Sequence, residues 1–130
     1  MVEKTRAVID LRRKAPRAPQ LRLGGFAVAA RVLDKCRAEQ AGINGECHYN
    51  CPIDRAFFAA SGLNAVDFSA MVATGADDAV AGDWIRREAK SGVLGRSVWN
   101  VLATLYPGFL IMLLDDWIHA RRAGHQSGGQ

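Results

Sequence analysis

The residues with the greatest chemical potential lie close together, between Glu46 and Asp54. This stretch, ECHYNCPID, brings two thiols, one imidazole and two carboxylates into nine residues. A thiol beside an imidazole can act as a nucleophile with its general base, and the same groups can bind a transition metal. Cysteine and aspartate can also serve only as helix caps, with no catalytic or metal-binding role. The stretch therefore has three interpretations: a metal site, an activated thiol or a structural helix start.

The spacing of the cysteines argues against a metal. Structural zinc is usually held by paired motifs such as C-x2-C, whereas Cys47 and Cys51 form one C-x3-C pair with no second pair in the chain. Besides His48, the remaining candidate ligands are distant in sequence: Cys36, His119 and His125. We therefore expect neither a metal nor an organic cofactor.

An activated thiol would be Cys51. A residue before proline avoids the helical region, so Cys51 is expected at the N-cap with Pro52 as the first helical residue. The positive end of the helix favours a thiolate there, and His48 would be its base. Asp54 is the third candidate catalytic residue. In the structural interpretation it is instead an acid at the third helical position, where capping and the helix dipole favour one.

Positive charge is concentrated near the N-terminus. The chain has 17 Lys plus Arg against 13 Asp plus Glu. Seven basic residues fall in one run, opposed within it by Asp10: Lys4, Arg6, Arg12, Arg13, Lys14, Arg17 and Arg22. Such a run favours contact with phosphate, but no aromatic residue interleaves the charges for base stacking. The run is either a nucleic-acid interface or a solvated arm.

Length and composition predict one compact all-α domain. The 130 residues leave no room for a second domain. Residues 1–24 contain two prolines and no apolar period, which predicts an irregular basic arm packed on or flanking the domain. Residues 25–123 form the helical domain, of five to six short helices, and residues 124–130 form a frayed tail.

Apolar spacing and capping signals place the helices. The first is expected over 26–41, with an apolar stripe at Phe26, Ala29, Ala30 and Leu33 and charges largely off it at Asp34, Lys35, Arg37 and Glu39. The second begins at Pro52 and stops at Gly62, and Asn64 with Asp67 starts a third. Another begins at Asp77 and Asp78 and turns Val80, Trp84 and Ile85 inward. The last two are expected over 97–106 and 109–123.

One uncharged stretch raises the question of a membrane segment. Residues 97–114 contain no charged residue, and the length of this stretch approaches that of a transmembrane helix. Pro107-Gly108 interrupts it, however. Before that break, Val98, Leu102 and Leu105 share one face, and Ser97, Asn100 and Thr104 share the other. We expect two buried helices that meet at the Pro-Gly corner, and no membrane contact.

The cysteines and the first residues bear on the cellular compartment. The three cysteines are an odd number, and the first residues lack the apolar region of a secretory signal. We expect free thiols in the cytoplasm.

Several short sequence motifs follow one another along the chain in a characteristic order. They are Asp10–Arg12, Pro16–Pro19, Leu23–Phe26, Leu33–Ala38, Gly45–Glu46, Tyr49–Asp54, Phe57–Phe58, Gly62 and Trp99–Asn100. From about residue 9 to residue 100, the chain resembles the bacterial proteins catalogued as domain of unknown function 5069. It departs from their pattern at Ala18, where serine is frequent, at Phe26, where tyrosine is usual, and at Cys47, where an aromatic or aliphatic residue is commoner.

The resemblance implies a shared motif without a known activity. Its recurring residues are Asp34, Lys35, Arg37, Glu46, Asn50, Cys51 and Asp54. Charged residues in such a motif form either a binding surface or an internal network of ion pairs. The family supplies no catalytic residues to carry over.

These observations favour a binding module for a small molecule or a partner protein. Its surface would be the 26–41 helix with the 46–54 loop, and its candidate binding residues are Asp34, Lys35, Arg37, Glu46 and Asn50. The alternatives are a thiol-dependent enzyme that uses Cys51, and a nucleic-acid binder that uses the basic arm. The sequence determines neither the oligomeric state nor whether an activity exists.

Overall fold

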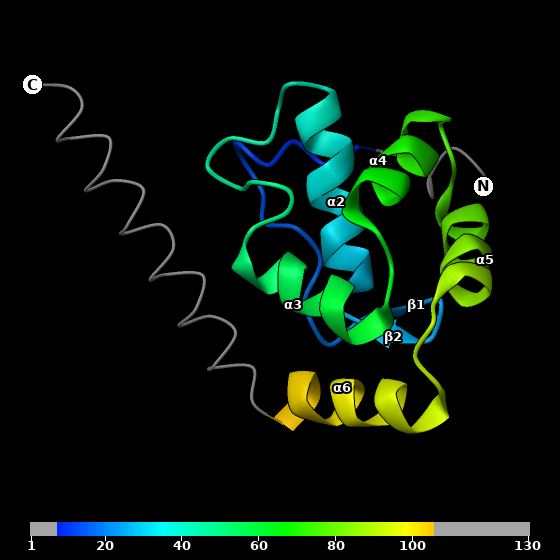
Figure 1. Ribbon diagram of the computed structural model, residues 1–130. Coiled ribbons are helices and arrows are strands. Elements are labelled where there is room, and N and C mark those ends of the chain that lie inside the picture. Colours follow the sequence, from blue (N-terminus) through cyan, green and yellow to red (C-terminus); the bar gives the residue numbers. More distant parts are fainter. Residues whose placement is uncertain (1–7, 106–130) are drawn as a thin grey trace, which may run out of the picture.

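The computed structural model describes residues 8–105 and is mostly helical (Figure 1). This range contains two short strands and five helices: β1 (Arg22–Leu23), β2 (Phe26–Ala27), α2 (Ala29–Gln40), α3 (Pro52–Ser61), α4 (Ala65–Ala73), α5 (Asp78–Glu88) and α6 (Val93–Leu105). Helix α2 lies at the centre, α3, α4 and α5 surround it, and α6 crosses one end beside the strands. The all-α expectation is confirmed for this range. The helix expected over 109–123 and the tail over 124–130 lie outside the described residues.

The chain enters α2 through a β-hairpin, not through a helix that begins at Phe26 as the sequence pattern predicted. Leu23 pairs with Phe26 in an antiparallel register, and Arg22 with Ala27. Gly24 and Gly25 form the two-residue turn with φ of 62° and 86°. A two-residue hairpin turn with positive φ at both central positions favours glycine, which adopts this conformation without steric cost.

The helix ends follow the predicted capping signals. Cys51 is the N-cap of α3, Pro52 its first residue, and Gly62 its left-handed C-cap with φ 76°. At the start of α4, the Asn64 side chain accepts hydrogen bonds from two backbone N–H groups, at 2.8 and 3.0 Å. At the start of α5, the Asp77 carboxylate accepts one from the Val80 N–H at 2.9 Å. These boundaries depend on local geometry, so sequence alone predicts them.

An aromatic cluster forms the centre of the core. Phe57 and Phe58 of α3 meet with ring centroids 5.3 Å apart, and Phe58 meets Phe68 of α4 at 5.5 Å. From α5, Ile85 is fully buried, as expected, and Trp84 packs against the cluster. The expectation that Val80 faces inward is wrong, because its side chain is half exposed.

Helix α6 begins earlier than predicted and faces the other way. It starts at Val93, not at Ser97, and its buried residues are Asn100 and Ala103. The Asn100 amide accepts a hydrogen bond from the Ala27 N–H at 2.7 Å and donates one to the Gly25 carbonyl at 2.8 Å. The indole N–H of Trp99 donates to the Ala27 carbonyl at 2.8 Å. These bonds turn the side of α6 that carries Asn100 toward the hairpin, so the stripe predicted to be buried points outward. Of the three polar residues predicted on the other face, only Asn100 is buried, and Ser97 and Thr104 are exposed.

Within residues 8–105, no single helix is long and apolar enough to cross a membrane. Taken as one segment, α3 and α4 are long and apolar enough by length and composition, but the two helices are bent by 99° relative to each other.

Replacing Gly24 by alanine should destabilise the fold far more than the same change at Gly42. Both residues have positive φ, which costs alanine about 1 kcal/mol or more. A Cβ at Gly24 would lie 2.7 Å from the Ile85 side chain, whereas one at Gly42 meets nothing within 4 Å. Crowding of that kind adds about 1–3 kcal/mol. Urea unfolding of the two variants checks this, and equal losses would contradict the close packing of α5 on the turn.

Candidate functional site

Three charged residues of α2 are buried, contrary to the expectation that they lie off the apolar face. Asp34, Lys35 and Arg37 are 2%, 1% and 7% exposed. A buried charge is costly unless an opposite charge and hydrogen bonds compensate for lost hydration. Each of the three meets this requirement through a different neighbouring segment.

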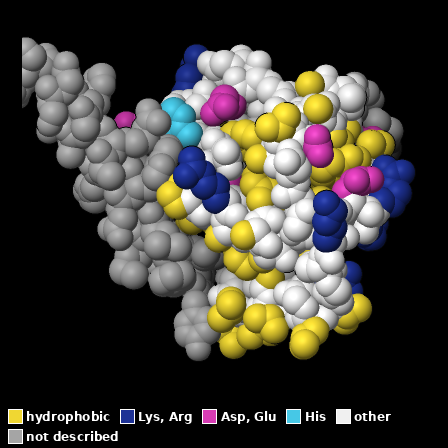
Figure 2. Space-filling model, viewed as in Figure 1, with side chains coloured by type: hydrophobic (Ala, Val, Ile, Leu, Met, Phe, Trp, Pro, Cys, Tyr) yellow, Lys and Arg dark blue, Asp and Glu magenta, His cyan; other side chains and the backbone are white. Residues whose placement is uncertain are grey.

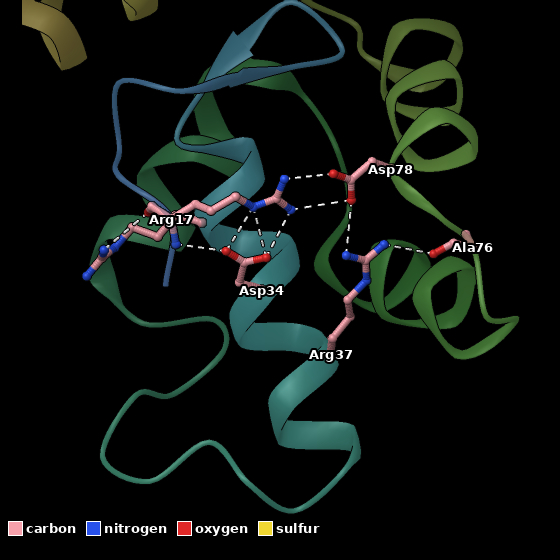
Figure 3. Close-up of polar contacts among 6 residues, drawn as sticks. Arg17, Asp34, Arg37, Ala76 and Asp78 are labelled. Atoms are coloured by element: carbon pink, nitrogen blue, oxygen red, sulfur yellow. Dashed lines mark hydrogen bonds and ion pairs between the residues drawn. The ribbon is translucent and has the colours of Figure 1, made fainter. Parts of the chain in front are cut away.

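Asp34 and Arg37 belong to one network that Arg17 and Asp78 complete (Figure 3). The Arg17 guanidinium lies between the carboxylates of Asp34, at 2.9 Å, and Asp78, at 2.7 Å. Arg37 donates to the second Asp78 oxygen at 3.0 Å and to the Ala76 carbonyl at 2.9 Å. The network joins the N-terminal arm, the centre of α2 and the start of α5.

The charge state of Arg17 is secured by its partners. Partial burial acts to lower the pKa of this guanidinium, but hydrogen bonds from it to Asp34 and Asp78 outweigh burial and raise the pKa. The backbone N–H of Arg17 also donates to Asp34, at 2.8 Å. The partly exposed Arg17 guanidinium is therefore already paired with two carboxylates, which leaves it less available to a ligand as part of the basic run.

Lys35 pairs with Asp54 in the second buried cluster. The Lys35 Nζ lies 2.7 Å from an Asp54 carboxylate oxygen and 3.1 Å from the Cys51 sulfur. The other Asp54 oxygen accepts the Asn50 backbone N–H at 2.8 Å. Asn50 has a φ of 65°, a left-handed conformation that asparagine tolerates better than most residues. The cluster thus attaches the loop before α3 to the centre of α2.

The predicted site residues consequently separate into two groups. Asp34, Lys35, Arg37, Asp54 and Cys51 lie inside the protein. The remaining three are at least partly accessible: Glu46 is exposed, and His48 and Asn50 are half-buried. The charged motif residues of α2 and α3 are therefore paired inside the fold, and the accessible predicted residues lie in the loop before α3.

A basic hollow lies beside that loop. It has a volume of about 540 Å³ and is lined by Leu11, Arg12, Arg13, Lys14, Ala15, Pro16, Arg31, Gly45, Glu46 and Cys47. Four of these residues are cations and one is a carboxylate. The arm is fixed there because Leu11 is buried and its N–H donates to the Ile43 carbonyl at 3.0 Å. The cations of the arm are evident from the sequence, but Arg31 was not predicted here, since no local signal shows that α2 places it beside them.

The cations around the hollow differ in how strongly they are paired. A side-chain hydrogen bond from Arg12 lowers the pKa of Asp10 to about 2, so this carboxylate offsets Arg12 across the working pH range. Arg13 is 84% exposed and reaches Asp10 only at 3.9 Å. The Arg31 guanidinium donates to the Arg17 carbonyl at 3.5 Å, a weak bond. Arg13 and Arg31 are thus held less firmly by Asp10 and the Arg17 carbonyl than Arg12 is held by Asp10.

A second hollow lies beside the same loop and has one charged residue in its lining, Glu39. It measures about 590 Å³ and is lined by Glu39, Tyr49, Asn50, Ala65, Val66, Ser69, Ala70 and Ala73. Its polar groups already have partners. The Tyr49 hydroxyl donates to the Ala65 carbonyl at 2.5 Å, and Glu39 accepts the Tyr49 N–H at 3.2 Å. Burial raises the pKa of Tyr49, so the hydroxyl stays protonated.

The three cysteines are free thiols in different environments. Cys47 is half-buried and lines the basic hollow, whereas Cys36 and Cys51 are each 1% exposed. Burial raises the pKa of Cys36 to about 12. Within residues 8–105, no group of three or more His, Cys, Asp or Glu side chains is arranged to hold a metal ion.

The model of the family DUF5069, described as a domain of unknown function, matches residues 13–99. The chain belongs to this family. The matched range includes the whole of the ion-pair network and the basic hollow from Arg13 onward, and it ends within α6. A search of curated proteins finds no match to the chain.

The buried pair of this DUF5069 domain should show strong energetic coupling. Asp54→Asn leaves the Lys35 ammonium buried without a counter-charge, which costs about 3–5 kcal/mol. Lys35→Met leaves the Asp54 carboxylate buried without a counter-charge. The double variant should lose clearly less free energy of unfolding than the two single variants lose in sum. Urea unfolding supplies the double-mutant cycle. The exposed pair Asp83 and Arg86, 2.9 Å apart, is the control, with coupling of about 1 kcal/mol or less. Additive losses at Lys35 and Asp54 would contradict the pairing.

The thiols should react with N-ethylmaleimide in an order set by burial. At pH 8 the native protein should first gain one adduct, at Cys47, at least about tenfold faster than at Cys36 or Cys51. Peptide mass spectrometry identifies the site, and urea-unfolded protein, in which all three thiols should react at similar rates, is the control. Labelling of Cys51 first would show an accessible, activated thiol and would support the enzyme hypothesis.

Proposed function

We propose that this protein is a binding module and that the basic hollow takes a small anionic ligand that carries phosphate or carboxylate groups. One observation carries the proposal. Cations from two separate segments, residues 12–14 of the arm and Arg31 of α2, surround a single hollow of about 540 Å³. Guanidinium groups present several donors in a plane and bind oxyanions in that geometry.

The arrangement of charge supports a ligand over a structural role for these cations. Inside the protein, the guanidinium groups of Arg17 and Arg37 already meet carboxylates. Around the hollow, the exposed Arg13 reaches the Asp10 carboxylate only at 3.9 Å. The volume lies in the range of small-molecule sites. An anion would add negative charge to a lining in which four cations face one carboxylate, Glu46.

A nucleic acid fits the same surface less well. No aromatic residue lines the hollow, so bases have no stacking platform there. Arg17, one of the cations of the basic run, is held by Asp34 and Asp78. The contiguous cations left for a backbone are Arg12, Arg13 and Lys14. We therefore favour a small anion.

The thiol-enzyme alternative has one observation in its favour and one against it. The Lys35 ammonium, 3.1 Å from the Cys51 sulfur, would stabilise a thiolate. The sulfur is buried, however, and Asp54 already neutralises that ammonium at 2.7 Å.

We also propose that the protein works in the reducing cytoplasm. The three free thiols agree with that compartment.

Calorimetric titration of the full chain should detect binding of an oxyanion. The probes are inorganic pyrophosphate, citrate and a 20-nucleotide single strand, each in low and in physiological salt. Arg13→Ala and Arg31→Ala should each weaken binding of the preferred small anion by about three- to tenfold, because each removes a cation from the hollow. Arg87→Ala, which removes an exposed arginine of α5 that does not line the hollow, is the matched control and should change affinity less than twofold.

The three probes separate the outcomes. Tighter binding of pyrophosphate than of citrate identifies a phosphate ligand, and the reverse order identifies a carboxylate ligand. Both results support the proposal if the two arginine variants lose affinity and Arg87→Ala does not. Equal losses in all three variants would show non-specific charge attraction and would overturn it. Binding of the oligonucleotide alone, with a steep salt dependence, would favour the nucleic-acid alternative.

A further inference from the structure

Asp10 lies just before the segment that brings Arg12, Arg13 and Lys14 to the basic hollow. Its side chain is 30% exposed and does not line the hollow itself. The Asp10 carboxylate lies 2.9 Å from the Arg12 guanidinium and 3.9 Å from that of Arg13. A negative charge so close to an anion site repels the ligand. Charge alone therefore predicts that Asp10 opposes binding.

Asp10 also closes the turn from which these three cations project. One oxygen of its carboxylate accepts the backbone N–H of Arg12 at 3.0 Å. Its backbone carbonyl accepts the N–H groups of Arg13 at 3.1 Å and of Lys14 at 3.0 Å. Three consecutive N–H groups thus bond to one residue. Aspartate favours such turns because its side chain reaches the backbone N–H two positions ahead.

The turn is attached to the rest of the domain on both sides. Before the cations, the buried Leu11 donates its N–H to the Ile43 carbonyl at 3.0 Å. Leu11 also packs closely against Gly45, where a Cβ would lie 3.0 Å from the Leu11 carbonyl oxygen. After the cations, Arg17 pairs with Asp34 at 2.9 Å. The cations lie between these two anchors, so the conformation of the turn determines where their side chains begin.

We propose that Asp10 is a positioning residue of the basic hollow, and that its turn orders the three cations of the arm for an anion. This role rests on the proposed function, since the hollow is the same. Cations on an ordered backbone lose less conformational entropy when an anion binds than cations on a mobile one. Asp10 thus assists binding through the turn, although its charge offsets Arg12.

Two substitutions separate the turn from the charge. Asp10→Asn removes the negative charge but keeps a side-chain oxygen that can accept the Arg12 N–H. Asp10→Ala removes the same charge and also that acceptor. Because the two variants carry equal charge, a difference in affinity between them reports the contribution of the turn.

Calorimetric titration of the full chain with inorganic pyrophosphate and with citrate measures this difference. Asp10→Ala should bind the preferred anion about two- to tenfold more weakly than Asp10→Asn, the range expected for the loss of one hydrogen bond. Amide exchange of the ligand-free protein, followed by NMR, tests the turn directly. The amides of residues 12–14 should exchange at least about threefold faster in Asp10→Ala than in Asp10→Asn, and those of α2 should not change.

Asp83→Ala is the matched control. Asp83 also lies 2.9 Å from an arginine, Arg86, but this pair belongs to α5 and does not line the hollow. In Figure 2, acidic and basic side chains lie next to one another on the right-hand side of the molecule, where Figure 1 shows α5. The variant removes the same charge as Asp10→Ala and leaves the turn intact. It should change the affinity for either anion less than twofold.

The outcomes separate this role from the proposed function. Weaker binding by Asp10→Ala than by Asp10→Asn, with faster exchange of residues 12–14, supports the positioning role. Equal affinities of the two variants, while the unsubstituted protein binds an anion, would show that Asp10 acts only through its charge and would overturn it. Unchanged exchange of residues 12–14 in Asp10→Ala would do the same. Binding of neither anion by the unsubstituted protein would overturn the proposed function and this role together.

Discussion

The structure depends on the requirement that the buried charges of α2 be paired. An ionised side chain removed from water is tolerated only with a counter-charge and hydrogen bonds in good geometry. Asp34 meets this requirement through Arg17, Lys35 through Asp54, and Arg37 through Asp78. These contacts attach the N-terminal arm, the start of α3 and the start of α5 to one central helix. Because each pair has its own geometry, a shift of any segment would leave a charge unpaired, so the pairs specify one arrangement.

This constraint also determines where a function can reside. The residues that looked most suited to chemistry in the sequence are buried together: the Lys35 ammonium lies close to both the Asp54 carboxylate and the Cys51 sulfur. Fixing the arm through Arg17 has a second consequence, because it positions the neighbouring Arg13 and Lys14 beside Arg31. The internal network thus builds the basic hollow from segments that are distant in sequence. The candidate binding surface and the structural motif are neighbours, joined by the arm, and are not the same residues.

Features that depend on a few neighbouring residues were predicted correctly. The cap at Cys51 and Pro52, the stop at Gly62 and the start at Asn64 follow from backbone sterics and local hydrogen bonds. The hairpin was missed although Gly24-Gly25 is a recognised turn signal, because strands of two residues give no alternating pattern. The orientation of α6 was wrong for a different reason. Hydrophobic periodicity identifies which residues share a face, but it does not show which face meets the core when Asn100 finds hydrogen-bond partners there.

By itself, the sequence determined the helical class, most of the helix ends and the family to which the chain belongs. Tertiary structure alone decided which charges are interior, since the burial of Asp34 depends on Arg17, seventeen positions away, and that of Arg37 on Asp78, forty-one positions away. It also decided that Arg31 joins the cations of the arm around one hollow. The physical reason is the range of the interactions. Caps and turns are satisfied within four residues, whereas charge pairing in the interior depends on how distant segments pack.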